Sequence, residues 1–328
     1  MGILLIGGKS YQAFSSVEVL GFDNCSVPDL PEWRYNHGSF LTEWGALAVC
    51  GGFWEGKPLS SSDCLVLNSA LKQWERGILG DVLGGTVLGV VSLNAGTYMI
   101  HPFTSSFLPS GEHEWIAGPA PQEEVQCATG ISSTSFLFIS NRSVHEFDSS
   151  LDWLEGDSSF AAPRQSPSVA GTPEPGNQWP DLRAERYRPA CTTFQDMVIV
   201  AGGRNNKGGL LNSVEIIYLD SKGSRFAKNM PFPFDFVKLV VLSSTLVMLG
   251  GTNQTSVYTW QGAAESWREA SQSLATSRTH FSALVTTDEV CSNGPLPPHS
   301  CSTVDGGTCV FPFTNGNFSL MKKHQRWS

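Results

Sequence analysis

Short apolar runs that end in a double glycine recur along the chain. The four clearest are ILLIGG at Gly7-Gly8, LAVCGG at Gly51-Gly52, VIVAGG at Gly202-Gly203 and LVMLGG at Gly250-Gly251. Their second glycines are 44, 151 and 48 residues apart, and 151 is close to three times 50. The spacing predicts two weaker copies in between, and TYMIHPF (97–103) and FLFISNR (136–142) are apolar segments at the expected places. Self-similarity at this period is typical of a β-propeller.

Each unit continues in the same order after its glycines. A polar loop is followed by an alternating strand, as in SSVEVLGF, SDCLVLN, SVHEFD, NSVEIIYLD and TSVYTW. After a short turn comes an aromatic residue, namely Trp74, Trp115, Trp153, Phe226 or Trp267. Period-2 strands form small twisted sheets, glycines avoid a clash where the chain turns, and the aromatic fills the gap to the next sheet. One such sheet cannot bury both of its faces, so the units must stack.

The number of strands predicts how the ring closes. Apolar strands ending near 8, 52, 102, 141, 203 and 251 each need a leading strand, and five have one, ending near 41, 92, 132, 195 and 243. The first apolar strand has no leader, whereas THFSALVTT (279–287) is a leader with no strand after it. We therefore expect 279–287 to pair beside 3–8, because closure removes two exposed sheet edges. The sequence predicts an all-β, six-bladed propeller over residues 1–290.

The order Arg-x-x-His, strand, strand ending in Gly-Gly, Val-Glu strand and Trp is similar to the kelch repeat. The resemblance covers residues 3–290 and is strongest in the units at 34–76, 188–228 and 237–268. It implies a kelch-type β-propeller closed by pairing of its two terminal strands. It also implies a role in binding a protein partner through loops on one face.

Three segments depart from the repeat. An insert rich in Pro, Ser and Gly (156–187) separates two units and is predicted to be a mobile surface loop. Residues 291–300 contain SNGPLPPHS, which is typical of a short stiff linker. Residues 301–328 resemble the opening of a fibronectin type II module, because Cys309, Phe311, Pro312 and Phe313 match its Cys-x-Phe-Pro-Phe core. That family uses four cysteines in two disulfides, and no Cys follows Cys309, so we expect only a partial module.

Charge, hydrophobicity and cysteine content exclude several classes of partner and site. The net charge of −9 disfavours nucleic acid and anionic membranes as partners, and no apolar run approaches the roughly 20 residues of a membrane span. The eight cysteines show no CxxC or His pairing, so neither a metal site nor a cofactor is expected. Their even number permits disulfides, although buried free thiols suit Cys50 and Cys64 equally well.

Two locations stay open. The type II resemblance, the cysteines and four N-glycosylation sequons, at Asn24, Asn141, Asn253 and Asn317, favour a secreted protein. The sequons number hardly more than composition predicts by chance, and MGILLIGGKS is not a signal peptide, although a start inside a strand is consistent with an incomplete N-terminus. The alternative is a cytoplasmic kelch adaptor for ubiquitination or actin assembly, which in that family usually carries an additional partner domain.

Binding is favoured over catalysis. Galactose oxidases resemble this fold but need a Tyr/His/His copper site, and sialidases carry Ser-x-Asp-x-Gly-x-Thr-Trp turns that SSLDW does not match. No Gly-x-Ser-x-Gly motif is present, and the recurrence of His37 and His280 in the repeat favours structural roles. The loops FWEGKPLSSS (53–62) and RNNKGGLLN (204–212) carry aromatic and cationic side chains of the kind that anchor interfaces. We therefore predict that a protein or glycan ligand contacts Phe53, Trp54, Arg204 and Asn205, although ordinary solvated loops would have the same composition.

Overall fold

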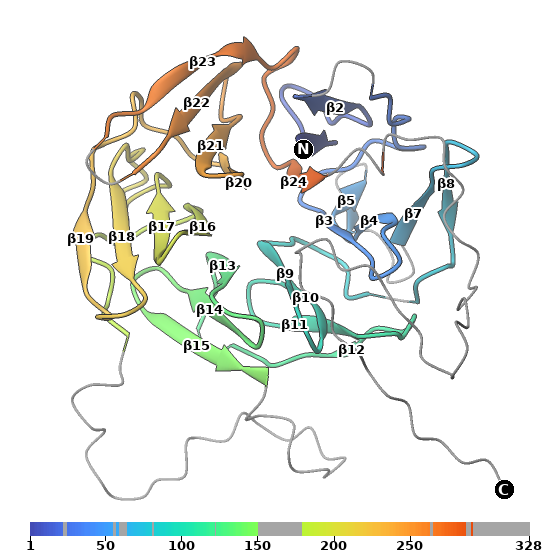
Figure 1. Cartoon of the computed structure of the whole chain (residues 1–328), viewed down its shortest axis with the longest axis horizontal. Coiled ribbons are helices and arrows are strands. Elements are labelled where there is room, and N and C mark those ends of the chain that lie inside the picture. Colours follow the sequence, from blue (N-terminus) through green and yellow to red (C-terminus); the bar gives the residue numbers. More distant parts are fainter. Residues whose placement is uncertain are drawn as a thin grey trace, which may run out of the picture.

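The computed structural model describes residues 1–21, 25–54, 57–58, 64–80, 82–121, 123–149, 179–262, 265–286 and 290. In these residues 24 β-strands form six small antiparallel sheets and one two-stranded hairpin. Figure 1 shows the six sheets arranged as blades around a common centre. The predicted fold class, an all-β six-bladed propeller, is confirmed.

The blades follow one another along the chain, and the strands of each run from the centre of the ring outward. Blade 1 contains, in that order, β24 (Ser282–Thr286), β1 (Gly2–Ile6) and β2 (Val17–Leu20). Blade 2 contains β3 (Gly38–Leu41), β4 (Leu47–Cys50), β7 (Cys64–Asn68) and β8 (Gln73–Arg76), with the hairpin β5 (Phe53–Trp54) and β6 (Lys57–Pro58) between β4 and β7. Blade 3 contains β9 (Gly89–Leu93), β10 (Gly96–Ile100), β11 (Ser105–Pro109) and β12 (Ile116–Ala117).

The other three blades repeat this pattern. Blade 4 contains β13 (Cys127–Gly130), β14 (Ser135–Ile139) and β15 (Val144–Asp148). Blade 5 contains β16 (Ala190–Phe194), β17 (Met197–Ala201), β18 (Val214–Tyr218) and β19 (Ser224–Phe226). Blade 6 contains β20 (Lys238–Leu242), β21 (Thr245–Leu249), β22 (Ser256–Trp260) and β23 (Arg268–Ser273).

The innermost strands form a closed ring. In chain order β3, β9, β13, β16, β20 and β24 each contact the next, and β24 contacts β3 in turn (Figure 1). These are the leading strands expected from the sequence. The two weak repeats, at 97–103 and 136–142, correspond to β10 and β14 and have the same place in their blades as the double-glycine strands.

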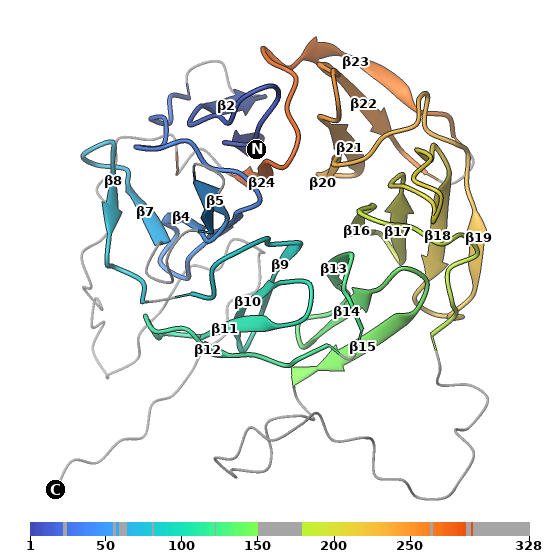
Figure 2. The same ribbon diagram turned by 180° about the vertical axis from the view of Figure 1, so that it is seen from behind.

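Blade 1 joins distant parts of the chain. Strand β24 pairs antiparallel with β1, from Gly2 opposite Thr286 to Ile6 opposite Ser282, and Lys9 bridges to Thr279 just beyond the strand ends. Figure 2 shows the N-terminus between β2 and β24. The pairing predicted between 279–287 and 3–8 is therefore present.

The double glycines lie where one blade meets the next. Gly7 and Gly202 have φ values of +56° and +66°, and a Cβ at either would lie 2.5 Å from a carbonyl oxygen of the following blade, that of Arg34 or of Phe234. The next residue donates its N–H to that same oxygen, from Gly8 to Arg34 and from Gly203 to Phe234, at 2.8 Å in both cases. The first glycine thus allows the close approach, and the second makes the hydrogen bond between blades.

Three buried arginines reinforce these junctions. Arg34, Arg186 and Arg278 precede the inner strands of blades 2, 5 and 1, and each donates to the carbonyl oxygen of the first glycine of its own blade. Each guanidinium also lies near a carboxylate, that of Glu32, Glu215 or Glu18. The Arg of the repeat therefore has a structural role, since its charge is paired inside the protein.

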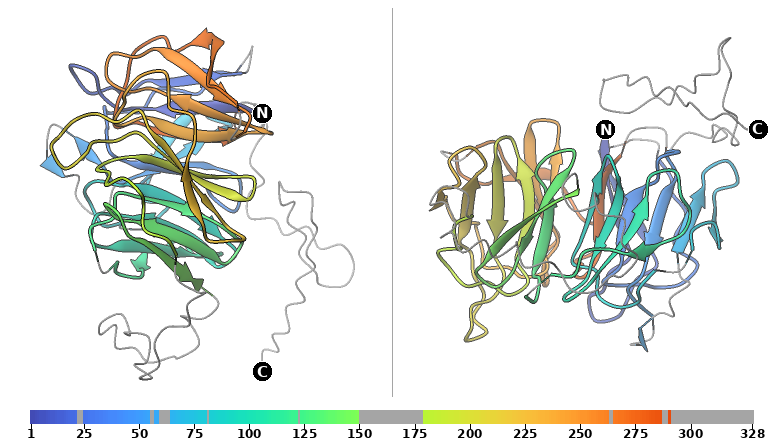
Figure 3. Two further views of the ribbon diagram at one scale, coloured as in Figure 1. Left: turned by 90° about the vertical axis from the view of Figure 1, so that its left-hand side faces the viewer. Right: turned by 90° about the horizontal axis from the view of Figure 1, so that it is seen from below.

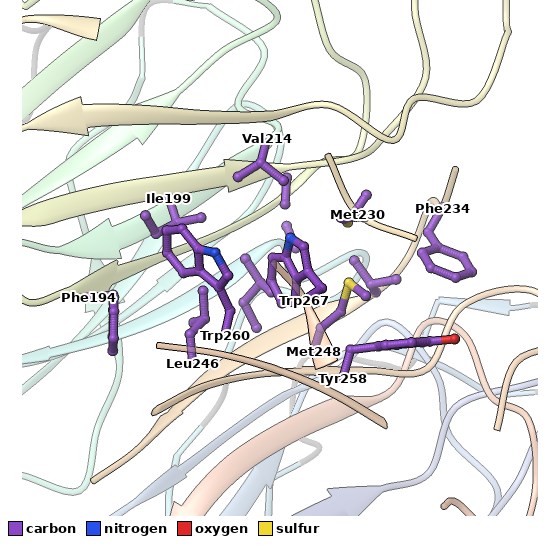
Figure 4. Close-up of a cluster of buried hydrophobic side chains, with 14 of the residues drawn as sticks. Phe194, Ile199, Val214, Met230, Phe234, Leu246, Met248, Tyr258, Trp260 and Trp267 are labelled. Atoms are coloured by element: carbon purple, nitrogen blue, oxygen red, sulfur yellow. The ribbon is translucent and has the colours of Figure 1, made fainter. Parts of the chain in front are cut away.

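Aromatic residues fill the space between several blades. Trp260 and Trp267 stack with ring centroids 5.7 Å apart in a cluster shared by blades 5 and 6 (Figure 4). Trp115 of blade 3 meets Phe40 of blade 2 edge to face. The expectation that Phe226 fills such a gap is wrong, because its side chain is exposed and Met230, from the segment after β19, lies in the cluster. Trp153 lies outside the described residues.

Two disulfides are present in the described residues. Cys50 and Cys64 face each other on β4 and β7 within blade 2. Cys127 and Cys191 join the inner strands of blades 4 and 5. The alternative of free thiols at Cys50 and Cys64 is therefore wrong.

The predicted insert, linker and partial module fall largely outside the described residues. The part of the insert that is described, 179–187, packs against blades 4 and 5, with Trp179, Leu182 and Arg186 buried. Residues 156–178, the linker at 291–300 and the type II-like segment at 301–328 are not described. No helix of the described residues is long and apolar enough to cross a membrane.

The close approach at the blade junctions predicts that glycine-to-alanine substitutions lower the free energy of unfolding more at a junction than elsewhere. Gly202→Ala should lower the free energy of unfolding by about 2–4 kcal/mol, because its Cβ combines a left-handed backbone with overlap on a neighbouring carbonyl. Gly45 is a matched control, since it has φ +80° and no atom within 4 Å of its Cβ position. Gly45→Ala should cost only about 1–2 kcal/mol. Equal losses in chemical unfolding would contradict the role assigned to the Phe234 carbonyl.

Candidate functional site

A cavity of about 100 Å³ opens at the centre of the ring, where the six inner strands begin. Every blade contributes to it through residues just before, or at the start of, its inner strand. We call this cavity the central pocket. Its lining residues are Asn36, His37, Thr86, Val87, Leu88, Gln126, Arg188, Pro189, Phe236, Val237, Lys238, His280 and Phe281.

Strand direction determines which loops surround the pocket. Because the strands alternate, the loops joining second to third strands and the connections between blades lie at the pocket end of the ring. We call this end the pocket face. The N-terminus, where β1 begins, lies on the opposite face, as the edge-on view in Figure 3 shows.

Four lining residues share an unusual backbone conformation. Asn36, Arg188, Phe236 and His280 have φ values of 55°, 55°, 57° and 56°, and each precedes its inner strand by two residues. A left-handed backbone at a residue other than glycine costs about 1–3 kcal/mol and is frequent at functional sites. Four such residues around one cavity mark it as a candidate site.

Three of these residues form a continuous stack. The guanidinium of Arg188 lies 5.0 Å from the centre of the Phe236 ring, and the Phe236 and His280 ring centroids are 3.6 Å apart. His280 in turn meets the edge of Tyr35, with centroids 6.3 Å apart. The stack connects blades 5, 6, 1 and 2 and gives one side of the pocket a wall of flat groups.

The charge of the pocket is positive although the chain is acidic. Its lining includes Arg188 and Lys238 but neither Asp nor Glu. Among the described residues, neither cation forms an ion pair with a carboxylate. Burial lowers the pKa of Lys238, so its ammonium group is poorly solvated. The nearest acid to Lys238 along the chain, Asp235, is bound to the Nε of Arg204 at 2.7 Å. The nearest acid to Arg188, Glu185, accepts a hydrogen bond from the Tyr187 hydroxyl.

The two histidines of the pocket are held neutral. Burial, together with Arg34 and Lys238, lowers the pKa of His37 to about 3. Burial, followed by Lys9, Arg188 and Lys238, lowers the pKa of His280 to about 3. His37 Nε2 lies 2.8 Å from Ser282 Oγ, a contact that connects blades 2 and 1. With both imidazoles neutral at neutral pH, Lys238 and Arg188 are the basic groups of the pocket, and burial lowers the pKa of Lys238.

The residues predicted to bind a partner lie on the pocket face. Phe53 stacks on Tyr35 at 5.5 Å, and Trp54 is 41% exposed. Arg204 is committed to the buried Asp235, and Asn205 accepts hydrogen bonds from the N–H groups of Lys207 and Gly209. Arg204 and Asn205 therefore shape their own loop, and both the Arg204 side chain, 42% exposed, and Trp54 are accessible.

Sequence reasoning did not find the central pocket. The predicted site residues came from loop composition, whereas the pocket is formed by one to three residues from each of six repeats. The available signal was the fixed offset of two residues before an inner strand, which places Asn36, Arg188, Phe236 and His280 at equivalent positions.

Exposed apolar side chains also lie on the pocket face. Tyr11 is 97% exposed in the β1–β2 loop, Phe232 is 50% exposed in the connection to blade 6, and Phe103 is exposed in the β10–β11 turn. Together with Trp54 they lie at the pocket end of four different blades. Exposed aromatic side chains gathered on one face of a protein are typical of interaction surfaces.

Other predicted features are only partly placed. Of the sequons, Asn253 is exposed in the loop after β21 and Asn141 is half-buried, whereas Asn24 and Asn317 lie outside the described residues. Within the described ranges no group of three or more His, Cys, Asp or Glu side chains could hold a metal ion.

Comparison with known proteins gives no relative, since neither a family model nor a curated protein matches this chain.

The burial of His37 predicts a pH-dependent loss of stability. Its folded-state pKa of about 3 lies below the ordinary value of 6.5, so between these values the unfolded chain binds more protons. Stability from this group is complete above pH 6.5 and falls as the pH drops, by up to about 1.4 kcal/mol per pH unit. Urea unfolding from pH 7 to 4.5 should show a steeper loss for the wild type than for His37→Gln. If the free energy of unfolding fell equally with pH in both proteins below pH 6.5, the role assigned to His37 would be contradicted.

Proposed function

We propose that this protein is a non-catalytic, extracellular binding scaffold of kelch type that recognises a protein or glycan through its pocket face. The observation that carries the proposal is that Tyr11, Trp54, Phe103 and Phe232 are exposed in loops at the same end of the ring as the central pocket. Large flat side chains lose little conformational entropy on binding and contribute most of the energy at many interfaces. A propeller suits this role because its blades hold six sets of loops at one end of a closed ring.

The disulfides support the extracellular part of the proposal. Disulfides persist in oxidising compartments, whereas cytosolic thiols are kept reduced. The Cys127–Cys191 bond joins two blades and the Cys50–Cys64 bond lies inside one, so both support the folded ring. An exposed sequon at Asn253 and the type II-like segment agree with secretion. The disulfides also make a cytosolic adaptor the less favoured alternative.

The pocket face should contain the main binding determinants. We expect Trp54→Ala, Tyr11→Ala or Phe232→Ala to weaken ligand capture, with at least one costing about 2 kcal/mol, or roughly 30-fold in affinity. Affinity purification with quantitative mass spectrometry, together with a glycan array, would identify and rank the ligands. Leu71→Ala is the matched control, because Leu71 is 61% exposed in the β7–β8 turn on the opposite face. Ligands retained by all three face variants but lost by Leu71→Ala would contradict this assignment.

Secretion can be tested on the intact chain. The protein recovered from culture medium should yield Cys50–Cys64 and Cys127–Cys191 linked peptides on mass spectrometry without reduction. Endoglycosidase treatment should increase its electrophoretic mobility, and Asn253→Gln should remove part of that shift. A cytosolic chain with reduced cysteines and no shift would contradict the proposed location.

A further inference from the structure

The central pocket contains two cations that the protein itself does not neutralise. The three arginines that are buried in the described residues, Arg34, Arg186 and Arg278, each lie near a carboxylate. Lys238 and Arg188 have no such partner among the described residues, and the lining of the pocket has no acidic side chain. Lys238, which is half-buried, therefore differs from the buried arginines in having no paired carboxylate, whereas Arg188 is exposed at the mouth of the pocket.

Leaving Lys238 in this state is energetically costly. A poorly solvated ammonium without a counter-charge is unfavourable, and the neutral His37 and His280 near the same lysine supply no negative charge. A bound anion would provide the missing counter-charge at the centre of the ring. The net charge of −9 makes this cationic site the exception on the molecule, so its charge is a local property of the pocket.

The apolar residues that line the pocket indicate what the uncharged part of the ligand is like. Phe236 contributes an aromatic ring that contacts Arg188 and His280, and Val87, Val237 and Phe281 add apolar surface. A cavity of about 100 Å³ accommodates a small group and excludes a large one. A flat apolar body that carries one carboxylate fits both the charge and the walls.

We propose that the central pocket binds a small organic carboxylate, with its carboxylate group held by Lys238 and Arg188 and its apolar part against Phe236. Such a carboxylate could belong to a free small molecule or to the terminal group of a larger partner. Titration with small probes tests the binding of the free small molecule alone. The inference rests on the proposed function for its biological role, because the pocket opens at the centre of the proposed binding face. Its test needs no macromolecular partner, so its failure would leave the results for Trp54, Tyr11 and Phe232 unaffected.

Calorimetric titration of the full chain with benzoate and with benzamide tests the charge, since the two differ mainly in the carboxylate. We expect benzoate to bind and benzamide not to bind. Acetate, which has a carboxylate but no ring, tests the contribution of the apolar body. Sulfate tests whether the pocket binds any oxyanion. Weaker binding of acetate than of benzoate supports the proposal, whereas binding of sulfate without benzoate would overturn it.

Variants assign the binding to the pocket. Lys238→Met and Arg188→Gln should each weaken benzoate binding at least about tenfold, whereas Lys238→Arg should retain most of it. Lys72→Gln is the matched control, because Lys72 is an exposed cation with φ 50° in the β7–β8 turn on the opposite face. Thermal unfolding midpoints would verify that each variant is folded. Benzoate affinity unchanged in folded Lys238→Met, or reduced equally by Lys72→Gln, would overturn the proposal.

Discussion

The approach of one blade's double glycine to the backbone of the next is the constraint on which the ring depends. A carbonyl oxygen lies 2.5 Å from the position that a Cβ would take at Gly7 or Gly202, so only glycine allows the blades to meet at this distance. The hydrogen bond from the following glycine then fixes the angle between blades. Six blades close without strain only if each junction keeps nearly the same geometry, which explains why the motif recurs.

The same junction positions the central pocket. The carbonyl that accepts the glycine N–H belongs to Arg34, Phe234 or Arg278, and the left-handed residue that lines the pocket follows two positions later, as Asn36, Phe236 or His280. The inner strand begins two residues after that. A side chain at the left-handed position is therefore held by the blade junction on one side and by the inner ring on the other. Pocket geometry and blade packing are two consequences of one short segment.

This relation explains what the sequence could predict. Glycine pairs and alternating strands reflect backbone constraints that every repeat must satisfy. The number of blades, the order of the strands and the pairing of 279–287 with 3–8 could therefore be predicted from the sequence. The pocket depends on which side chain occupies one position in each repeat, and Arg188, Phe236 and His280 have no common chemistry. Their convergence exists only in three dimensions. The pairing of Arg204 with buried Asp235 is likewise visible only in three dimensions, and the binding role predicted for Arg204 stays a prediction.

Blades 3 and 4 lack the double glycine and meet their neighbours by other means. Between blades 3 and 4, aromatic rings carry the contact, with Tyr98 and Phe136 centroids 5.1 Å apart in a shared cluster. Between blades 4 and 5, the Cys127–Cys191 disulfide connects the two inner strands directly. A covalent bond thus occurs at a junction where the glycine contact is missing, and a dense aromatic cluster occurs at the other. The ring requires a fixed distance at every junction, and the chain achieves it with backbone approach, ring packing or a covalent bond, according to which residues each repeat contains.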